Sequence, residues 1–313
     1  MPLTIVVAGG SGFIGREVVA RLATAGHRVI VPTRRRYRAR ELYLLPTVEV
    51  VECDVTVPAK LVRLLRGADA LLNLVGILNE SGRATFARVH VDFARDIVAA
   101  CEAAGVRRYV HMSAQNAAPD APSKYLRSKG EAEAIVAASS LAWTVFRPNV
   151  VFGRGDRLTS MFVGLAGFGM PLPLGGANAE LAPVWVEDVA WCIARALTLD
   201  ATILQRYELC GPQAMTLASL VRTTLDIAGR PRAVIPLPDG LARLLAAVLE
   251  RLPGKLLTRD NLASLSVPAV CAAPFPAVFG VEPTPFAALA PSWLGPGAAR
   301  SEYDVFRARV GRD

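Results

Sequence analysis

The N-terminal stretch Thr4-Ile-Val-Val-Ala-Gly-Gly-Ser-Gly-Phe-Ile-Gly15 decides the fold class of this chain. Residues 4–8 form a short run of β-branched and apolar residues, which is typical of a buried strand. A glycine-rich turn follows at once, and apolar residues then recur at helical spacing from Phe13 to Ala25, where Gly26 signals a helix end. A strand that enters a helix through such a turn predicts the opening unit of a layered α/β sheet.

The spacing of Gly9, Gly12 and Gly15 is GxxGxxG, which is typical of a phosphate-binding loop. The first glycine permits a tight turn, the second lets the backbone approach a pyrophosphate, and the third lets helix and strand pack closely. The helix N-terminus adds free N–H groups and the positive end of the helix dipole. The predicted loop site consists of Gly9, Ser11, Gly12, Phe13, Ile14 and Gly15.

The end of the second strand, expected at Arg28–Val31, indicates which dinucleotide binds. The chain continues there as Pro32-Thr33-Arg34-Arg35-Arg36, and its next carboxylate is Glu41. An acidic residue would accept hydrogen bonds from the ribose of NAD, whereas arginine forks suit a 2′-phosphate. We therefore predict NADP(H) rather than NAD, with Arg34 and Arg35 as ligands. The alternative is a solvated basic loop.

Strands and helices alternate through the first half of the chain, which predicts a Rossmann-type, doubly wound parallel sheet in residues 1–150. Further strands are expected at Val48–Val51, Ala70–Leu74, Arg108–Met112 and Trp143–Phe146, and helices at Pro58–Arg66, Ala84–Ala104 and Ser123–Ala138. The predicted cofactor site includes residues that follow these strands: Asp54, Val55, Leu74, Val75, Gly76, Pro148 and Val150.

The alternation of strands and helices ends after Pro148, where glycine, proline and short apolar runs fill residues 150–183. Helices are expected at Glu187–Leu199, Leu217–Ala228 and Thr258–Leu265, and a strand at Arg206–Leu209. We predict that elements around 183–210 return to the first sheet. Residues 151–313 are then a smaller C-terminal α/β domain for a substrate or partner, with a proline-rich tail.

A second group of residues suggests proton-transfer chemistry. Ser113 follows the fifth expected strand, and Tyr125 and Lys129, which are also predicted to bind the cofactor, form a YxxxK pair. Positions i and i+4 share one face of a helix, so an ammonium would lie beside the phenol. A neighbouring positive charge lowers the pKa of a tyrosine, which would fit it for acid–base work, while the serine hydroxyl would hold a substrate oxygen.

Composition and charge exclude several classes of protein. The chain has 313 residues, 52% hydrophobic and 20% charged, which supports a large core and argues against disorder. The net charge is +8, carried almost entirely by arginine. The arginines are dispersed without interleaved aromatics, so we expect an anionic cofactor and no nucleic-acid partner.

Cysteines and histidines are few and scattered. The five cysteines (Cys53, Cys101, Cys192, Cys210 and Cys271) include no CxxC pair, so we expect unpaired, buried thiols in a reducing compartment. The three histidines lie far apart, which argues against a metal site.

No leader segment is visible, and the two long uncharged stretches, 158–179 and 261–281, are broken by proline and glycine. We expect a cytoplasmic protein. The amphipathic stretch Leu241–Arg251 is expected to pack on the protein's own core, and the alternative is a helix that docks on a partner or membrane.

The chain resembles the extended and atypical short-chain dehydrogenase/reductases over residues 3–200, through Gly9, Gly12, Gly15, Ser113, Tyr125, Lys129 and the segment 184–190. It is more closely similar to the NADPH-binding accessory subunit of respiratory complex I, the alpha subcomplex subunit nine family, and its bacterial relatives. The motifs that carry this likeness are VIVPTR (29–34), NLVG (73–76), YLRSK (125–129), FGRGDR (152–157), FGMPLPLG (168–175) and LTRD (257–260).

This resemblance implies a Rossmann core, bound NADPH and, in mitochondria, a structural place at the quinone end of the complex, against the membrane. It adds a respiratory complex or membrane surface as a partner, and a peripheral position on the inner face of the cytoplasmic membrane. Other members are associated with quinone biosynthesis. Where extended enzymes commonly have asparagine on the fourth helix, this chain reads Arg88-Val89-His90.

Two functional hypotheses stay open at this point. The first is an accessory or assembly protein that holds NADPH as a structural ligand, with a role in a respiratory complex or in quinone metabolism. The second is an active NADPH-dependent oxidoreductase that uses Ser113, Tyr125 and Lys129 on a lipophilic or quinone-related carbonyl. A sugar-nucleotide epimerase is a variant of the second, less favoured because those enzymes retain NAD.

Overall fold

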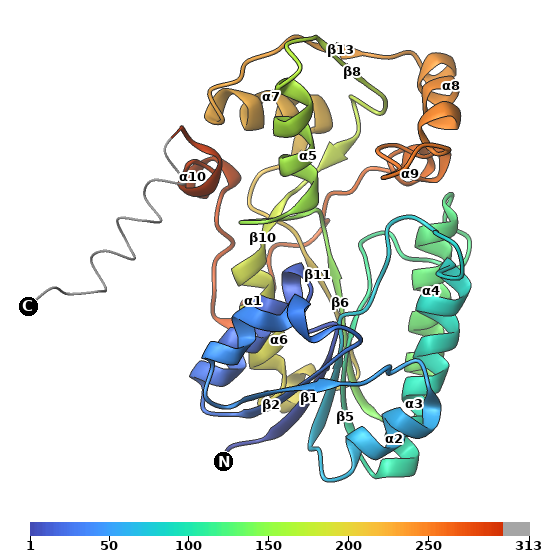
Figure 1. The fold of residues 1–313 in the computed structure, drawn as a ribbon, viewed down its shortest axis with the longest axis vertical. Coiled ribbons are helices and arrows are strands. Elements are labelled where there is room, and N and C mark those ends of the chain that lie inside the picture. Colours follow the sequence, from blue (N-terminus) through green and yellow to red (C-terminus); the bar gives the residue numbers. More distant parts are fainter. Residues whose placement is uncertain (297–313) are drawn as a thin grey trace, which may run out of the picture.

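A seven-stranded parallel sheet forms the centre of the computed structural model, which describes residues 1–296 (Figure 1). Every neighbouring pair of strands in it is parallel. The strand order is β3 (Val48–Glu52), β2 (Arg28–Thr33), β1 (Thr4–Ala8), β4 (Ala70–Asn73), β5 (Arg108–Met112), β6 (Ala142–Pro148) and β11 (Gln205–Leu209). The winding direction reverses between β1 and β4. The predicted Rossmann-type, doubly wound sheet is confirmed.

Helices cover both faces of this sheet, which explains why its central strands β1 and β4 are buried along almost their whole length. On one face lie α1 (Phe13–Thr24) and α6 (Val186–Ala196), and on the other lie α2 (Pro58–Leu65), α3 (Phe93–Ala104) and α4 (Lys124–Ala137) (Figure 1). Val18 of α1 and Ile193 of α6 belong to the first core cluster, whereas Leu61, Phe93 and Val136 belong to the second.

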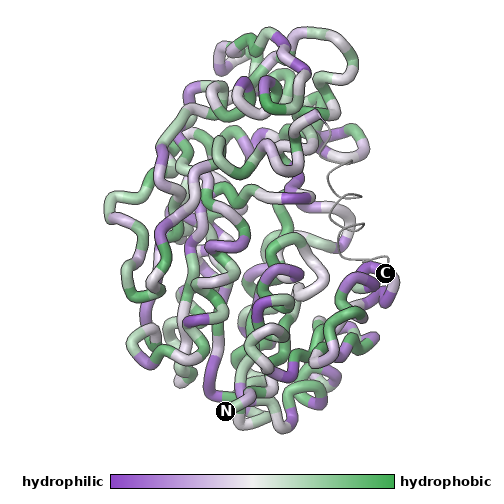
Figure 2. Tube along the Cα trace, turned by 90° about the vertical axis from the view of Figure 1, so that its left-hand side faces the viewer, coloured by the Kyte–Doolittle hydropathy of each residue, from purple (hydrophilic) through white to green (hydrophobic). Residues whose placement is uncertain are grey.

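A smaller group of elements lies beyond the carboxyl ends of the strands (Figure 1). It contains the helices α5 (Arg157–Ala166), α7 (Leu217–Ile227), α8 (Asp239–Leu249), α9 (Arg259–Ser264), α10 (Phe286–Leu289) and α11 (Pro291–Leu294). Three two-stranded pairs accompany them: β7 (Val151–Phe152) with β10 (Val184–Trp185), β9 (Glu180–Leu181) with β12 (Met215–Thr216), and β8 (Leu172–Leu174) with β13 (Val234–Pro236). Phe152, Phe162 and Leu220 belong to a core cluster of its own. Hydrophobic segments accordingly run through both parts of the molecule (Figure 2). The division into two domains at residue 150 stays a prediction.

Three local features differ from the sequence prediction. Residues 36–44 form a 3₁₀ helix, and the long helix expected at Ala84–Ala104 is divided into a π-helical turn, Ala87–Asp92, and α3. The irregular segment after residue 150 contains α5, whose N-cap Asp156 accepts a hydrogen bond from the backbone of Thr159. The end of the proline-rich tail, residues 297–313, lies outside the described residues.

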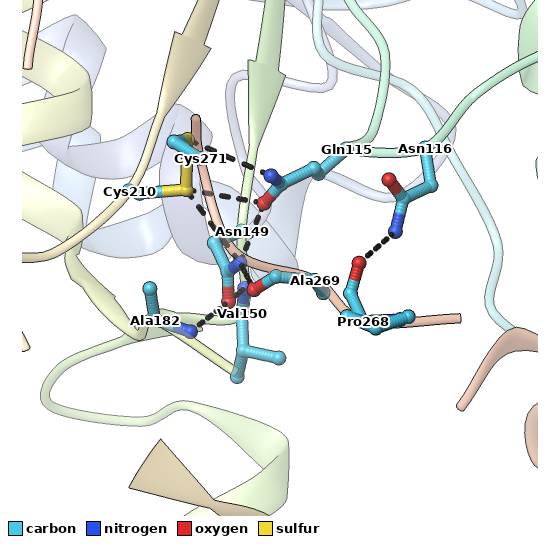
Figure 3. The surroundings of a disulfide bond; sticks show 9 residues. All are labelled: Gln115, Asn116, Asn149, Val150, Ala182, Cys210, Pro268, Ala269 and Cys271. Carbon is cyan, nitrogen blue, oxygen red and sulfur yellow. Dashed lines mark hydrogen bonds between the residues drawn. A yellow bond between two sulfur atoms is a disulfide. The ribbon is translucent and has the colours of Figure 1, made fainter. Parts of the chain in front are cut away.

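The expectation for the cysteines is wrong for two of the five. Cys210, just after β11, and Cys271 form a disulfide across 61 residues of chain, with their Cα atoms 6.0 Å apart (Figure 3). The fold brings together two positions whose spacing in sequence carries no pairing signal. Cys53, Cys101 and Cys192 are unpaired, and the last two are buried, as expected.

The disulfide attaches the segment around residues 268–271 to the carboxyl end of β11, and hydrogen bonds attach it to residues that follow β5 and β6. Asn116 donates a hydrogen bond to the Pro268 carbonyl (2.9 Å), and the Asn149 side-chain amide donates to the Ala269 carbonyl (Figure 3). Within residues 1–296, no helix is long and apolar enough to cross a membrane. The same residues hold no group of three or more His, Cys, Asp or Glu side chains suited to a metal ion.

Candidate functional site

The glycine loop lies at the point where the strand order reverses, between β1 and β4. Gly9 has a φ of +85°, and a Cβ there would lie 2.8 Å from the carbonyl carbon of Leu74. A Cβ on Gly15 would overlap the Gly9 carbonyl oxygen. Both positions therefore require glycine, the first for conformation and space and the second for space alone.

The N-terminus of α1 is open to a ligand. Its N-cap Gly12 makes no side-chain capping hydrogen bond, and the first turn contains no acidic residue. The backbone N–H groups and the dipole of the first turn can therefore serve an anion. Together with the close approach of Gly9 to Leu74, this is the shape that a dinucleotide pyrophosphate needs.

Arginines lie at the carboxyl end of β2, next to Asp54. Burial raises the pKa of the Asp54 carboxyl, but hydrogen bonds from Thr56 and the charges of Arg34 and Lys60 together lower it. Arg35 donates a hydrogen bond to the phenol oxygen of Tyr37 (3.2 Å). Thr33 of β2 pairs with Glu52 of β3, so the residues that follow the two strands lie at the same edge of the sheet, where the adenosine half of a dinucleotide would bind.

The other predicted cofactor residues gather at the same edge of the sheet. Leu74, Val75 and Gly76 follow β4, and the N–H of Leu74 donates to Ala8 at the end of β1 (2.9 Å). Pro148 ends β6, with Val150 two residues beyond it. Ser11, Phe13, Ile14 and Val55 belong to the turns and first helical residues at this edge. Their contacts with a cofactor stay predictions.

Ser113 is the residue whose surroundings most clearly indicate a bound ligand. It directly follows β5 and is 3% exposed, and its hydroxyl is buried without a hydrogen-bond partner among residues 1–296. A buried, unpaired hydroxyl costs free energy, and the nearby His111 Nε2 is also buried without a partner, so both atoms could be satisfied by a bound ligand.

Tyr125 and Lys129 lie in the first two turns of α4, on the side that faces the end of β5. Lys129 is buried and its ammonium donates to the carbonyl oxygen of Met112 (2.9 Å), the residue before Ser113. The structure therefore brings the serine and the lysine together. It places Tyr125, half-buried, one helical turn from Lys129.

The pKa values of this pair follow from burial. Burial lowers the pKa of Lys129 to about 8, although the nearby Glu133 carboxylate opposes the change. Burial raises the pKa of Tyr125 to about 12. This direction is opposite to the lowering expected from a neighbouring ammonium, because desolvation of the phenol sets the pKa. The phenol is therefore protonated at neutral pH and suited to donate a proton.

Two further residues join the site that the sequence prediction did not assign to it. His90, in the π-helical turn, is buried against Tyr125, with ring centroids 5.7 Å apart. Asp260, of α9, accepts hydrogen bonds from the backbone N–H groups of Lys124 (2.7 Å) and Tyr125 (3.1 Å). A π-helical interruption is common at functional sites, but neither contact between distant residues is visible in the sequence.

An open groove of about 690 Å³ lies between α5 and the turn that precedes α9. Met161, Leu165, Phe168 and Leu256 give it apolar walls, and Asp156 and Arg157 lie at one end. The groove is suited to an apolar chain.

The comparisons with known proteins agree with this geometry. A family model described as NAD(P)H-binding matches residues 9–159. The mitochondrial NADH dehydrogenase (ubiquinone) 1 alpha subcomplex subunit 9 of Rattus norvegicus is 31% identical over 287 residues, which cover 89% of this chain and 76% of that protein. The chain belongs to the subunit 9 family.

Other relatives extend this assignment. The subunit 9 of Arabidopsis thaliana is 32% identical over 78% of this chain, but the match spans 63% of that protein's length. A ceramide reductase of Caulobacter vibrioides is 30% identical, covering 75% of this chain and 74% of its own. The crystal structure of an NADPH-dependent quinone oxidoreductase of Escherichia coli with NADPH shares the fold, with a TM-score of 0.73, 19% identity and coverage of 91% and 98%.

Proposed function

We propose that this member of the subunit 9 family binds NADPH at the carboxyl edge of its sheet and uses it to reduce a carbonyl or quinone group on a lipophilic substrate. The proposal rests on the hydroxyl of Ser113, which is buried without a partner among the described residues. Ser113 directly follows Met112, whose carbonyl accepts a hydrogen bond from Lys129, and it lies at the edge of the sheet where the cofactor is expected. A polar group on a bound ligand would satisfy that hydroxyl.

The preference for NADPH rests on the basic end of β2. Arg34 and Arg35 are exposed there, and no carboxylate follows in the chain before Glu41. We expect Arg34→Ala to weaken NADPH binding about tenfold or more, because charge-assisted hydrogen bonds contribute roughly 1.5–3 kcal/mol, and to leave NADH binding unchanged. Arg40→Ala, at an exposed arginine six residues further on, is the matched control. Equal losses for both dinucleotides would refute the assignment.

The three polar side chains divide the chemistry between them. The nicotinamide supplies a hydride when the cofactor is bound. Ser113 is placed to donate a hydrogen bond to the substrate oxygen, and Tyr125, protonated below about pH 12, to donate the proton that this oxygen needs. The Lys129 ammonium then stabilises the phenolate that proton donation leaves.

The apolar groove favours a lipophilic substrate. Its walls of Met161, Leu165, Phe168 and Leu256 can hold an apolar chain. The relative named ceramide reductase and the fold shared with a quinone oxidoreductase support the same class.

The decisive test compares the wild-type protein with Tyr125→Phe. Purified protein is denatured, released nucleotide is identified by mass spectrometry, and NADPH oxidation is followed with a short-chain quinone and a long-chain ketone. We expect Tyr125→Phe to keep its NADPH affinity and lose at least 99% of turnover. Equal turnover in both proteins would refute catalysis by this site, and released NAD in place of NADP(H) would refute the cofactor preference.

A second function, docking on a membrane surface, is favoured by the orientation of α8. Its buried side consists of small residues, Ala242 and Ala246, whereas Leu241, Leu244 and Val248 are 55%, 63% and 51% exposed. The helix packs on the protein through these alanines and leaves the three larger apolar side chains at the surface. Ala242 lies close to Gly175, where an added Cβ would come within 3.1 Å of the Ala242 Cβ.

The stretch of chain that contains α8 is basic. Residues 230–260 contain six arginines and lysines against three acidic residues, which suits an anionic lipid surface. We infer that α8 rests on the inner face of the cytoplasmic membrane, where a respiratory-complex partner and lipophilic substrates are also found. This fits an accessory role as well as a catalytic one.

Vesicle sedimentation tests the docking. We expect binding to vesicles with anionic lipid, weakening with salt, and at least a tenfold loss in Leu244→Gln. Leu44→Gln, at a leucine that is 85% exposed on another surface, is the control. No binding by the wild type, equal binding by both variants, or a change in oligomeric state instead of lipid binding would refute it.

A further inference from the structure

His90 connects the loop after β4 to the catalytic helix α4. It is 3% exposed, and its Nε2 accepts a hydrogen bond from the backbone N–H of Ile77 (3.2 Å). Its Nδ1 lies 2.8 Å from the hydroxyl oxygen of Ser128, on α4. The ring therefore bridges two segments that the cofactor and the substrate would both touch.

The hydrogen bonds assign the proton on this ring. The Ser128 hydroxyl donates to the backbone carbonyl of Tyr125 (2.7 Å), so its only proton is already used. Nδ1 must then carry the imidazole proton and donate it to Ser128, while Nε2 stays an acceptor for Ile77. Both ring nitrogens are satisfied in this one tautomer.

The space around His90 is tightly defined. Gly76 lies close to both the Lys129 ammonium and the His90 ring. A Cβ on Gly76 would be 3.4 Å from the Lys129 nitrogen and 3.6 Å from His90 Nε2. The His90 ring stacks on Phe86 at a centroid distance of 5.6 Å, and its edge meets Tyr125. The π-helical turn Ala87–Asp92 is what directs this side chain inward.

The charged and titratable neighbours keep His90 neutral. Burial, Lys129 on α4 and His111 on β5 lower its pKa to about 2. The imidazole therefore cannot take a proton at physiological pH, which excludes a role as general acid or as a protonated relay.

We propose that His90 is a positioning residue, which locks the loop Gly76–Ile77 against α4 so that Lys129 and Tyr125 meet the bound ligands in a single arrangement. The proposal rests on the proposed function for its effect on catalysis, but the lock itself is a property of the protein alone.

Conservative variants separate the two hydrogen bonds. In His90→Gln, the amide oxygen takes the place of Nε2 and keeps the bond to Ile77, and the bond to Ser128 is lost. In His90→Asn, the amide N–H takes the place of Nδ1 and keeps the bond to Ser128, and the bond to Ile77 is lost. Ser128→Ala removes the second bond while leaving the imidazole in place.

Amide hydrogen exchange at Ile77 is the first readout, because it does not require activity. We expect its exchange to be at least tenfold faster in His90→Asn and close to wild type in His90→Gln, with unchanged circular dichroism for both. His90→Gln and Ser128→Ala each remove the hydrogen bond between His90 and Ser128. NADPH affinity should therefore fall roughly fivefold in each of these variants, with no further loss in the double variant.

The pH dependence of NADPH binding is the second readout. A released loop admits water to Lys129, so the apparent pKa of binding should rise from about 8 toward the ordinary value of a lysine, while Glu133 and His111 are unchanged. Wild-type exchange at Ile77 in His90→Asn, or additive losses in the double variant, would overturn the proposal. A wild type that does not bind NADPH would refute the proposed function, and the exchange experiment would still decide the role of His90.

Discussion

Removal of the Cys210–Cys271 disulfide should destabilise the protein without changing its native site. The bond closes a loop of 61 residues, and the loss of loop-closure entropy in the unfolded chain corresponds to about 4 kcal/mol at 25 °C. The native segment should stay in place, because Ala269 still donates to Glu180 (2.9 Å) and Asn116 still donates to Pro268 (2.9 Å).

Denaturant unfolding of the double variant Cys210→Ala/Cys271→Ala measures this effect, and Cys53→Ala, at an unpaired cysteine, is the control. We expect the double variant to lose up to about 4 kcal/mol of unfolding free energy and to bind NADPH as the wild type does. Thiol titration of the denatured, unreduced wild type should find three thiols out of five. Five thiols, or an unfolding midpoint that reductant leaves unchanged, would refute the reasoning.

Three more predictions concern the site. Gly15→Ala should weaken NADPH binding more than tenfold, because the added methyl group would overlap Gly9. Gly164→Ala is the control, since a Cβ there meets no atom within 4 Å, and fluorescence titration with NADPH compares the two variants. Asp260→Ala should lower the unfolding free energy by about 1–2 kcal/mol, because the first turn of α4 loses both acceptors, and chemical denaturation checks this. NADPH affinity should fall as the pH rises through about 8, where Lys129 loses its charge, and Lys129→Met should abolish this dependence. Because the folded pKa of Lys129 lies below its ordinary value, the free energy of unfolding of the wild type should rise relative to Lys129→Met between about pH 8 and 10.5.

Local patterns were sufficient for the sheet and for the approximate position of the site. The glycine spacing after β1 and the alternation of strands and helices predicted the Rossmann-type core, because each depends on a few neighbouring residues and on a fixed period. The YxxxK pair was placed on one helix face for the same reason. The sequence prediction missed α5, because glycine and apolar residues in this segment suggested irregular structure. The signal for the start of this helix is its N-cap residue, Asp156.

The residues that complete the site come from distant parts of the chain. Asp260 caps α4 from 135 residues beyond Tyr125, and His90 reaches Ser128 across 38 residues. Such contacts depend on how elements pack, and a single sequence does not contain that information. The roles assigned to Ser113, Tyr125, Lys129 and the cofactor residues stay predictions for the experiments above.

The sequence by itself determined the fold class, the dinucleotide loop and the pairing of tyrosine with lysine, because hydrogen-bonded periodicity and glycine conformations are local properties of the chain. Only the tertiary structure decided that Cys210 meets Cys271, that α8 leaves Leu241 and Leu244 exposed, and that burial sets the pKa of Lys129 near 8. Each of these depends on which surfaces are removed from water, and that is settled only when the whole chain has packed.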